Sequence, residues 1–471
     1  MYDLIIIGYG AGGFAAAIKA TELTEGKVSI ALIGNGPIGG TCVNVGCVPS
    51  KYMIEASNQY FYSSFNKYPG ITLKGATLDF KQVMIGLRNL VDELRNEKYE
   101  KVLNNYENID VFKGSAEFLS GNEVKVITDN GEKRIKGKKI IIATGSRPSV
   151  PPIEGLSESG FMDSNNVWSL DELPENIAVI GGGAIGLEFG QAFLHFGSKV
   201  TIFESLPRIA YLTEPEISQL LENILRREGM QIYTRTRIIK VTKRNERKII
   251  EYASHEGKKT LEVDEILIAT GRKPNTDALK LENAYVNVDD RGFIKVDKYM
   301  RTSNPNVYAV GDVVSKRFML ETLAAREGVI AAINALGGNA EIDYLSVPWA
   351  IFTTPQVAAV GYTEEEFMKL TGACSCRVIS LSSVAKARIL RDDAGLVKIT
   401  ADPNNGRIVG VHVLSNYASE YITEAAIAIR YGLGIEDLID VTHIFPTLSE
   451  GIKLAAQAFI RDISKMSCCV E

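Results

Sequence analysis

The sequence predicts an α/β protein in which two similar strand–turn–helix domains, one inserted within the other, are followed by a separate α+β domain. Two stretches, "YDLIIIGYGAGGFAAAIKA" and "NIAVIGGGAIGLEFGQAFLHFGSKVTIFE", each have the pattern of a buried strand, a glycine turn and a helix. Three further apolar strands end in small-residue turns, in "KIIIATGSRP", "EILIATGRKPN" and "NVYAVGDVV". After Asp343 the pattern changes to alternating strands followed by amphipathic helices.

Both glycine turns follow the spacing G-x-G-x-x-G. The matching residues are Gly8, Gly10 and Gly13 in the first stretch and Gly181, Gly183 and Gly186 in the second. Without side chains, such a turn is tight and lets the backbone approach a pyrophosphate at the helix N-terminus. In the second stretch the next strand ends on an acid, Glu204, as this Rossmann-type pattern requires. Two complete units predict that one chain binds two dinucleotides.

The domain limits follow from these strand ends. The second "ATG" precedes a return toward the first nucleotide domain, so the second nucleotide domain is expected to be inserted within the first. We expect the first domain at 1–145 and 273–345, the inserted domain at 146–272, and the α+β domain at 346–471. The last domain has an "NNG" turn between two strands and helices whose apolar faces suit subunit contact.

Composition excludes several classes of function. The 471 residues are 45% hydrophobic and 23% charged, with a formal net charge of -5 and no basic patch of the nucleic-acid-binding kind. No apolar run is long enough to span a bilayer, and the start of the chain lacks signal-peptide features. We expect a cytoplasmic protein, in which closely spaced cysteines indicate redox or metal chemistry.

The stretch "GGTCVNVGCVPSK" places Cys42 and Cys47 with four residues between them. It is expected to begin a helix, whose N-terminus lowers thiol pKa values. The spacing brings both sulfurs to one face, and Lys51 follows one helical turn later. Half of a zinc site is the alternative, but no second Cys/His pair with suitable spacing accompanies it.

On these motifs the chain resembles the pyridine nucleotide-disulfide oxidoreductases, flavoenzymes that include dihydrolipoamide dehydrogenase, glutathione reductase and mercuric reductase. The resemblance covers essentially the whole chain. It implies FAD in the first domain, NADH or NADPH in the second, and a homodimer formed through the third. It also implies that hydride passes from the nicotinamide to FAD, and then two electrons pass to the sulfurs.

The resemblance assigns roles residue by residue. Cys47 lies against the flavin, Cys42 faces the substrate, and Lys51 pairs with Glu188 of "GLEFG". Asp312 of "VGDV" holds the ribityl chain. Further FAD or nucleotide contacts are expected at Gly40, Thr41, Ala116, Thr144, Gly145, Gly271 and Leu320.

The motif "HIFPTLSEG" distinguishes among members of the family. Those that reduce organic disulfides carry histidine before the proline, because a leaving thiolate needs a proton. Here Phe445 precedes Pro446, so Glu450, the usual partner of that histidine, has no imidazole to orient. His443 lies two residues earlier, where a packed or exposed role is expected.

A thiophilic metal ion needs no such acid. Hg(II) prefers thiolates and leaves as the neutral metal after taking two electrons. The chain is similar to mercuric reductases in its Phe-Pro pair, its "GIKLAAQAF" helix and its adjacent cysteines near the end, Cys468 and Cys469. These two are expected to capture Hg(II) from thiol complexes and pass it to Cys42 and Cys47 of the other subunit, so that all four cysteines are metal ligands. Two incidental tail cysteines are the alternative.

The chain also departs from the family pattern. Gly34 stands where an acid usually binds the FAD ribose, and Thr447 stands where mercuric reductases commonly have tyrosine. Cys374 and Cys376, in "ACSC", match no motif and are expected to be surface thiols.

The choice of nicotinamide depends on Glu204. Its carboxylate accepts hydrogen bonds from a ribose 2′-OH and repels a 2′-phosphate, which favours NADH. Arg208 nearby would partly offset this in favour of NADPH.

The leading hypothesis is therefore an NAD(P)H-dependent mercury(II) reductase. The alternatives are a thioredoxin-reductase-like enzyme and a dihydrolipoamide-dehydrogenase-like enzyme, both of which predict histidine at position 445. A component of a multi-enzyme complex or a thiol–metal buffer is a further alternative, although a buffer would need no nucleotide folds.

Overall fold

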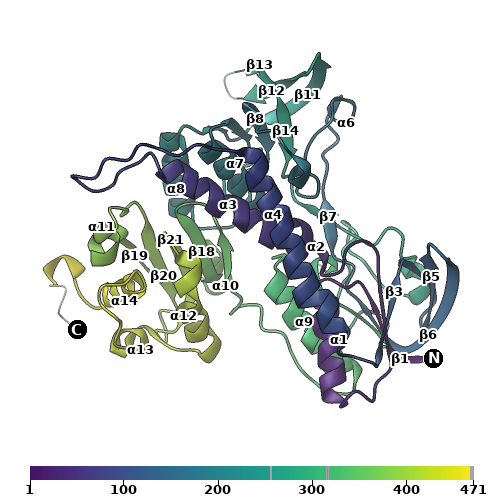
Figure 1. Ribbon diagram of the computed structural model, residues 1–471. Coiled ribbons are helices and arrows are strands. Elements are labelled where there is room, and N and C mark those ends of the chain that lie inside the picture. The colour runs from purple at the N-terminus through teal and green to yellow at the C-terminus, as the bar shows by residue number, and fades with distance from the viewer. Residues whose placement is uncertain (255–256, 315, 317, 467–471) are drawn as a thin grey trace.

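The computed structural model describes residues 1–254, 257–314, 316 and 318–466. The first nucleotide domain, the teal second domain and the yellow-green C-terminal domain lie around two long helices, α3 (Cys47–Tyr62) and α4 (Phe80–Arg95), as Figure 1 shows. None of the described helices is long and apolar enough to cross a membrane.

The first domain is built on a seven-stranded sheet in the order β3-β2-β1-β6-β5-β4, with β16 also paired to β6. Its strands are β1 (Tyr2–Ile7), β2 (Ile30–Gly34), β3 (Ile109–Lys113), β4 (Ser115–Ser120), β5 (Glu123–Thr128), β6 (Gly131–Ile142) and β16 (Val307–Ala309). The apolar run of β1 is buried because parallel strands flank it and helices cover it. Two of these helices, α1 (Ala11–Leu23) and α9 (Glu321–Ala335), pack on each other.

The second domain has its own parallel sheet in the order β10-β9-β8-β14. Its elements are β8 (Asn176–Ile180), α7 (Ala184–Phe196), β9 (Lys199–Phe203), α8 (Pro215–Glu228), β10 (Gln231–Tyr233) and β14 (Glu265–Ile268). An antiparallel sheet follows β10 and consists of β11 (Arg237–Arg244), β12 (Arg247–Ser254) and β13 (Gly257–Val263).

The chain enters and leaves the second domain through one short antiparallel pair, β7 (Ser146–Pro148) with β15 (Arg272–Pro274). After β15 it returns to the first sheet, where β16 pairs with β6. The limits 1–145, 146–272 and 273–345 stay a prediction.

The cysteine stretch forms two helices where one was expected. Helix α2 (Gly40–Val45) ends at Gly46, and Cys47 begins α3. A Cβ atom on Gly46 would lie 2.9 Å from the carbonyl oxygen of Thr41, so glycine is needed for this close turn. The break decides how the two thiols meet.

The C-terminal domain has a five-stranded antiparallel sheet in the order β17-β18-β21-β20-β19. Its strands are β17 (Trp349–Ile351), β18 (Gln356–Gly361), β19 (Ser375–Ser380), β20 (Leu396–Ala401) and β21 (Ile408–Ser415). Its helices are α10 (Glu364–Thr371), α11 (Ala385–Ile389), α12 (Ala418–Tyr431), α13 (Ile435–Asp440) and α14 (Glu450–Gln457). The short helices α5 (Lys101–Leu103) and α6 (Leu156–Ser159) belong to the preceding parts of the chain.

This last domain exposes large apolar side chains on and after α12. Tyr431 is 76% exposed and Ile444 is 79% exposed, and Ile427, Val441 and Phe445 are also exposed. Exposed apolar side chains gathered in this way are typical of a protein–protein contact.

Candidate functional site

The first glycine turn has the geometry of a pyrophosphate cradle. A Cβ atom on Gly8 would lie 2.1 Å from the carbonyl oxygen of Ala143, and one on Gly13 would lie 1.9 Å from that of Gly8. These two glycines are therefore required for packing. At Gly10, before α1, a Cβ atom would meet only the Cα of Gly40, at 3.6 Å. The middle glycine thus leaves the helix N-terminus open to a ligand.

The second turn repeats this arrangement. A Cβ atom on Gly181 would lie 2.3 Å from the oxygen of Ala269, and one on Gly186 would lie 1.9 Å from the oxygen of Gly181. A Cβ atom on Gly183 would meet nothing within 4 Å. The chain therefore has two open turns at the N-termini of long helices, which fit the phosphates of two dinucleotides.

The two turns differ at the end of the next strand. In the second domain Glu204 is buried, and its carboxylate accepts hydrogen bonds from the backbone N–H groups of Gly182 and Leu206, both at 2.7 Å. In the first domain Tyr9 stands at the place that Gly182 has in the second domain. A Cβ atom on Gly34 would lie 2.3 Å from the Tyr9 ring. The Tyr9 ring thus occupies the space that an acidic side chain at position 34 would need. This packing is the physical reason why Gly34 stands at that position.

A cavity of about 620 Å³ lies between the glycine turn of the first domain, α2, α3, α7 and the C-terminal domain. Nine of the predicted site residues line it: Gly10, Thr41, Cys42, Cys47, Lys51, Gly145, Glu188, Asp312 and Leu320. The cavity has open space for phosphates at Gly10, a polar corner around Asp312 and a pair of thiols. These three features together fit an FAD molecule.

Some predicted residues lie outside this cavity. The set consists of Gly8, Gly13, Gly40, Ala116, Thr144, Gly181, Gly183, Gly186, Glu204 and Gly271. Ala116 is buried on β4, and the Thr144 hydroxyl donates a hydrogen bond to the carbonyl oxygen of Asn275. A Cβ atom on Gly40 would lie 2.6 Å from the Cα of Gly10, so this glycine lets α2 approach the first turn.

Cys42 and Cys47 are not joined by a disulfide, and their side chains form a hydrogen bond across the α2–α3 break. Their mutual hydrogen bond, followed by burial, raises the pKa of Cys42 above its usual range. The hydrogen bond from Cys42 lowers the pKa of Cys47, and the Lys51 ammonium also acts in this direction. The inner pair therefore favours a thiolate at Cys47 and a thiol at Cys42. We expected the helix N-terminus to lower the thiol pKa, whereas the partner thiol is the largest cause.

Lys51 and Glu188 connect the two nucleotide domains inside the cavity. The Lys51 Nζ lies 2.8 Å from Glu188 Oε2 and 4.3 Å from the centre of the Phe352 ring. The other oxygen, Oε1, accepts a hydrogen bond from the backbone N–H of Phe352 at 2.9 Å. The predicted pairing of Lys51 with Glu188 is present, and Phe352 fixes its orientation. The catalytic role of this pair stays a prediction.

Asp312 lies in a polar corner that sequence reasoning described only in part. Its carboxylate accepts a hydrogen bond from the Ser146 hydroxyl at 2.9 Å, and Arg272 Nε lies 3.8 Å away. Burial lowers the pKa of Arg272, which the charge of Asp312 opposes. Arg272 and Ser146 stand on the paired segments β7 and β15, so their position beside the two "ATG" turns was an available signal.

Trp168 is a second residue that we did not predict. It lines the cavity, and its indole N–H donates to the carbonyl oxygens of Ser164 and Val45, at 2.8 Å and 3.2 Å. It stands in a segment without a recognisable motif, so no signal in the sequence indicated it.

The "HIFPTLSEG" segment holds no free imidazole. The His443 Nε2 lies 2.7 Å from Glu424 Oε1 on α12, and this hydrogen bond raises the pKa of His443. Phe445 is exposed, and the buried Oε2 of Glu450 has no hydrogen-bond partner. Burial raises the pKa of Glu450. Of the packed or exposed role expected for His443, the structure shows the packed one.

The remaining cysteines fall into two groups. Cys468 and Cys469 lie outside the described residues. Cys374 and Cys376 were expected to be surface thiols, but both are half-buried and their sulfurs are 3.2 Å apart.

Comparison with known proteins agrees with this geometry. Residues 2–328 match the family model described as pyridine nucleotide-disulphide oxidoreductase, and residues 347–456 match the dimerisation domain of the same family. The chain is 39% identical over 471 residues to a mercuric reductase of Streptomyces lividans, covering 99% of this chain and 98% of the relative. A mercuric reductase of Staphylococcus aureus is 36% identical over 470 residues, covering 99% and 84% of the two chains.

Solved structures show the same architecture. The Cu(II) complex of the HOCl-induced flavoprotein disulfide reductase RclA from Escherichia coli superposes with a TM-score of 0.86 at 30% identity, covering 98% of this chain and 99% of that one. LpdA from Mycobacterium tuberculosis has a TM-score of 0.88 at 24% identity, covering 98% of this chain and 100% of that one, and this likeness concerns the fold alone.

Proposed function

Because the chain belongs to the flavin-dependent pyridine nucleotide-disulphide oxidoreductases, we propose that it reduces thiol-bound Hg(II) to elemental mercury with NADH. Relatives that match nearly the whole chain are named mercuric reductases. The inner thiols, Cys42 and Cys47, are the soft ligands that such a cation prefers.

One observation favours a metal substrate over an organic disulfide, namely the absence of a proton donor at position 445. Phe445 is exposed there, and His443 is held by Glu424. A general acid contributes about 10²–10⁴-fold to a step that needs one. Two-electron reduction of Hg(II) held by two cysteines gives neutral mercury and returns both sulfurs as thiolates. Neither thiolate has to be protonated in order to leave the metal, so this step does not need the missing imidazole. Among the described residues, no histidine lines the cavity.

The two inner thiols divide the binding step between them. In line with the expectation that Cys42 faces the substrate, Cys42 meets the incoming cation, and Cys47, whose pKa Cys42 and Lys51 lower, is its second ligand. Cys42 then loses its proton on binding the same ion, because the positive charge of the metal replaces the hydrogen bond that kept the thiol protonated. Two thiolates then hold Hg(II) within the cavity.

Gly10, Asp312, Lys51 and Glu188 would surround an FAD whose chemistry, when bound, would be hydride acceptance from the nicotinamide and two-electron transfer to the dithiol-held metal. Gly10 and Asp312 would hold the FAD, and Lys51 and Glu188 would orient the ring region where the two nucleotides meet. The Phe352 ring lies against the Lys51 ammonium, 4.3 Å from Nζ to the ring centre, and helps to position it.

The nucleotide is proposed to be NADH. Glu204 is anchored by two backbone N–H groups, so its negative charge is fixed where a 2′-phosphate would lie. The Arg208 guanidinium donates to the carbonyl oxygens of Tyr211 and Thr213, both at 2.9 Å, and stacks on the Tyr211 ring. These contacts hold Arg208 Nη2 against the backbone, which supports NADH over NADPH as the proposed nucleotide.

The C-terminal cysteines are proposed to deliver the metal. The matched dimerisation domain and the exposed apolar side chains around Ile444 support a homodimer. In such a dimer Cys468 and Cys469 of one subunit would pass Hg(II) by thiolate exchange to Cys42 and Cys47 of the other.

The decisive assay is anaerobic oxidation of NADH by the FAD-loaded enzyme with Hg(II)–glutathione, lipoamide, thioredoxin or Cu(II) as acceptor. We expect oxidation with Hg(II) and release of mercury vapour, and a higher kcat/KM for NADH than for NADPH. Oxidation with lipoamide but none with Hg(II) would show that the assignment is wrong.

Two sets of variants separate chemistry from delivery. Cys42→Ser and Cys47→Ser should each abolish Hg(II)-dependent oxidation while FAD stays bound. The double variant Cys468→Ala with Cys469→Ala should lose activity only when Hg(II) is carried by bulky thiols. Equal rates of the tail variant and the unmodified enzyme with every carrier would remove the delivery role.

A further inference from the structure

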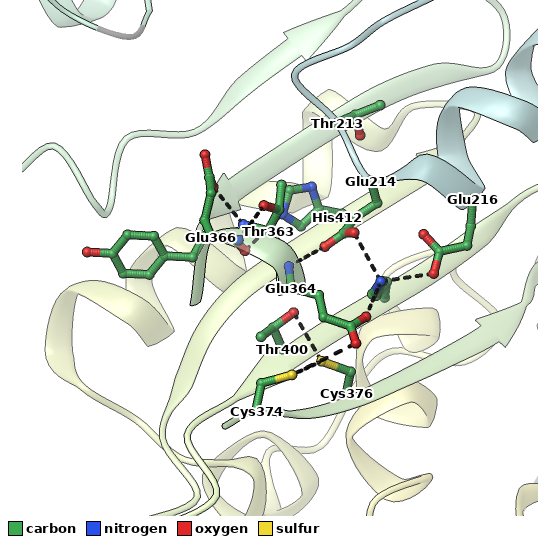
Figure 2. Close-up of polar contacts among 12 residues, drawn as sticks. Thr213, Glu214, Glu216, Thr363, Glu364, Glu366, Cys374, Cys376, Thr400 and His412 are labelled. Carbon is green, nitrogen blue, oxygen red and sulfur yellow. Dashed lines mark hydrogen bonds and ion pairs between the residues drawn. The ribbon is translucent and has the colours of Figure 1, made fainter. Parts of the chain in front are cut away.

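A second pair of thiols lies outside the cavity, in the C-terminal domain. The Cys374 and Cys376 sulfurs are 3.2 Å apart, and Cys374 Sγ lies 3.9 Å from Glu364 Oε1 (Figure 2). Among the described residues, Glu364, Cys374 and Cys376 are the group of His, Cys, Asp or Glu side chains that could hold a metal ion together. Their ligand atoms all lie within 4.8 Å of one another. The proposed reaction uses none of them.

The sheet register brings the thiols together. Cys376 on the edge strand β19 lies opposite Thr400 on β20, and Lys398 is two residues earlier on β20. Because side chains alternate along strands, Lys398 and Thr400 share one face of the sheet with Cys376. Cys374 precedes the first residue of β19 and brings its sulfur to 3.2 Å from that of Cys376. Helix α10 begins over this face, and its first residue is Glu364.

Glu364 is oriented so that one oxygen faces the thiols. Its backbone N–H donates to Glu214 Oε1 at 2.7 Å, which fixes the start of the helix. Its Oε2 lies 2.7 Å from the Lys398 Nζ, while Oε1 points to Cys374. Metal-binding carboxylates are commonly held in this way by a second interaction behind them.

The surroundings carry excess negative charge. The fully buried ammonium of Lys398 contacts Glu214 and Glu216, each at 3.0 Å, as well as Glu364. Three carboxylates around one ammonium leave two negative charges uncompensated among these four side chains. Such a field favours a divalent cation at the neighbouring thiols.

We propose that Glu364, Cys374 and Cys376 form a binding site for a thiophilic divalent cation of the Zn(II) and Hg(II) class. Two sulfurs and one carboxylate oxygen supply three ligands, which leaves a fourth position for water or a thiol. Tetrahedral Zn(II) with Zn–S bonds of about 2.3 Å separates two sulfurs by about 3.8 Å. Rotation about the Cα–Cβ bonds of both half-buried cysteines supplies the small widening that this requires.

A disulfide between these cysteines fits less well. Alternate residues of an extended strand have Cα atoms about 6.6–6.8 Å apart, at the upper limit of disulfide geometry. Because metal binding must displace thiol protons, the affinity of the site for the cation rises with pH.

The test uses the FAD-loaded protein with Cys42, Cys47, Cys468 and Cys469 all changed to serine, so that only the second thiol pair remains. Zn(II) binding is measured by equilibrium dialysis and elemental analysis, at pH 6.5 and 8.5. Flavin absorbance and the melting temperature report that each variant is folded. The readout is metal stoichiometry and does not depend on turnover.

We expect one Zn(II) per chain, bound more tightly at pH 8.5, and none after Cys374→Ser with Cys376→Ser. Glu364→Gln should weaken binding by about tenfold or more. Glu216→Gln is the matched control, because it removes another carboxylate from Lys398 without touching the thiols, and should change affinity less than about threefold. Competition with Hg(II)–glutathione identifies which of the two cations the site takes. Displacement of zinc assigns the site to Hg(II), and retention of zinc assigns it to Zn(II).

Three results would overturn the proposal. The first is that the four-serine protein binds no zinc. The second is that zinc stays bound after both remaining cysteines are replaced. The third is that Cys374 and Cys376 are isolated as a disulfide and that reduction of this disulfide does not increase zinc binding.

Discussion

The packing of Tyr9 on Gly34 leads to a quantitative prediction for Gly34→Glu. A Cβ atom at position 34 would lie 2.3 Å from Cδ1 and Cε1 of the Tyr9 ring, so the ring must move. Tyr9 is 3% exposed and its hydroxyl donates to the Gly36 carbonyl oxygen at 2.5 Å. Overpacking costs about 1–3 kcal/mol, and loss of the hydrogen bond adds about 0.5–1.5 kcal/mol. We expect Gly34→Glu to lower the free energy of unfolding of the first domain by about 1.5–4.5 kcal/mol.

A second substitution tests the cause. Tyr9→Gly alone empties a buried aromatic site and should cost about 3–5 kcal/mol. Together the two substitutions recreate the Gly182–Glu204 arrangement of the second domain, in which the carboxylate accepts a backbone N–H at 2.7 Å. The loss in the double variant should therefore be smaller than the sum of the single losses by about 1–3 kcal/mol.

Urea titration of the FAD-loaded protein, with flavin fluorescence as the signal for opening of the first domain, measures these free energies. Asn35→Glu is the control, because it adds a carboxylate at the same end of the sheet at an exposed position. If Gly34→Glu unfolds within about 0.5 kcal/mol of the unmodified protein, or if the two losses simply add, the steric explanation is refuted.

Two further predictions concern the C-terminal domain. Lys398→Met leaves the fully buried Glu214 without its cation and should lower the free energy of unfolding, measured by urea titration, by about 3–5 kcal/mol. Glu216→Gln is the control, because this carboxylate is half-exposed, and it should change the free energy of unfolding by less than about 1 kcal/mol. Equal losses in the two variants would contradict this prediction. The contact of His443 with Glu424 raises the pKa of the imidazole, so its stabilisation is complete below the unfolded pKa of about 6.5 and is lost as pH rises through the folded value. The melting temperature of His443→Gln should therefore differ from that of the unmodified protein more at pH 6 than at pH 9, and a difference independent of pH would exclude the ion pair as its cause.

Local patterns predicted the elements that carry the proposed reaction. The glycine turns were recognisable because a strand, a tight turn and a helix N-terminus are contiguous in the chain. The ion pair of Lys51 with Glu188 was reached only through resemblance to a family, since the two residues stand on helices far apart in sequence. The two-helix form of the cysteine stretch was missed, because the close approach of Gly46 to Thr41 is a property of the folded turn.

Taken alone, the amino-acid order determined the α/β class, the two nucleotide-binding turns and the inner thiol pair, because each depends on residues a few positions apart whose spacing sets their geometry. Only the folded chain decided that Tyr9 fills the space beside Gly34, and that Glu364, Cys374 and Cys376 meet beside Lys398. Those contacts join residues on separate strands and helices. Sheet register and side-chain packing bring these residues within reach of one another, and no local spacing in the sequence specifies either of them.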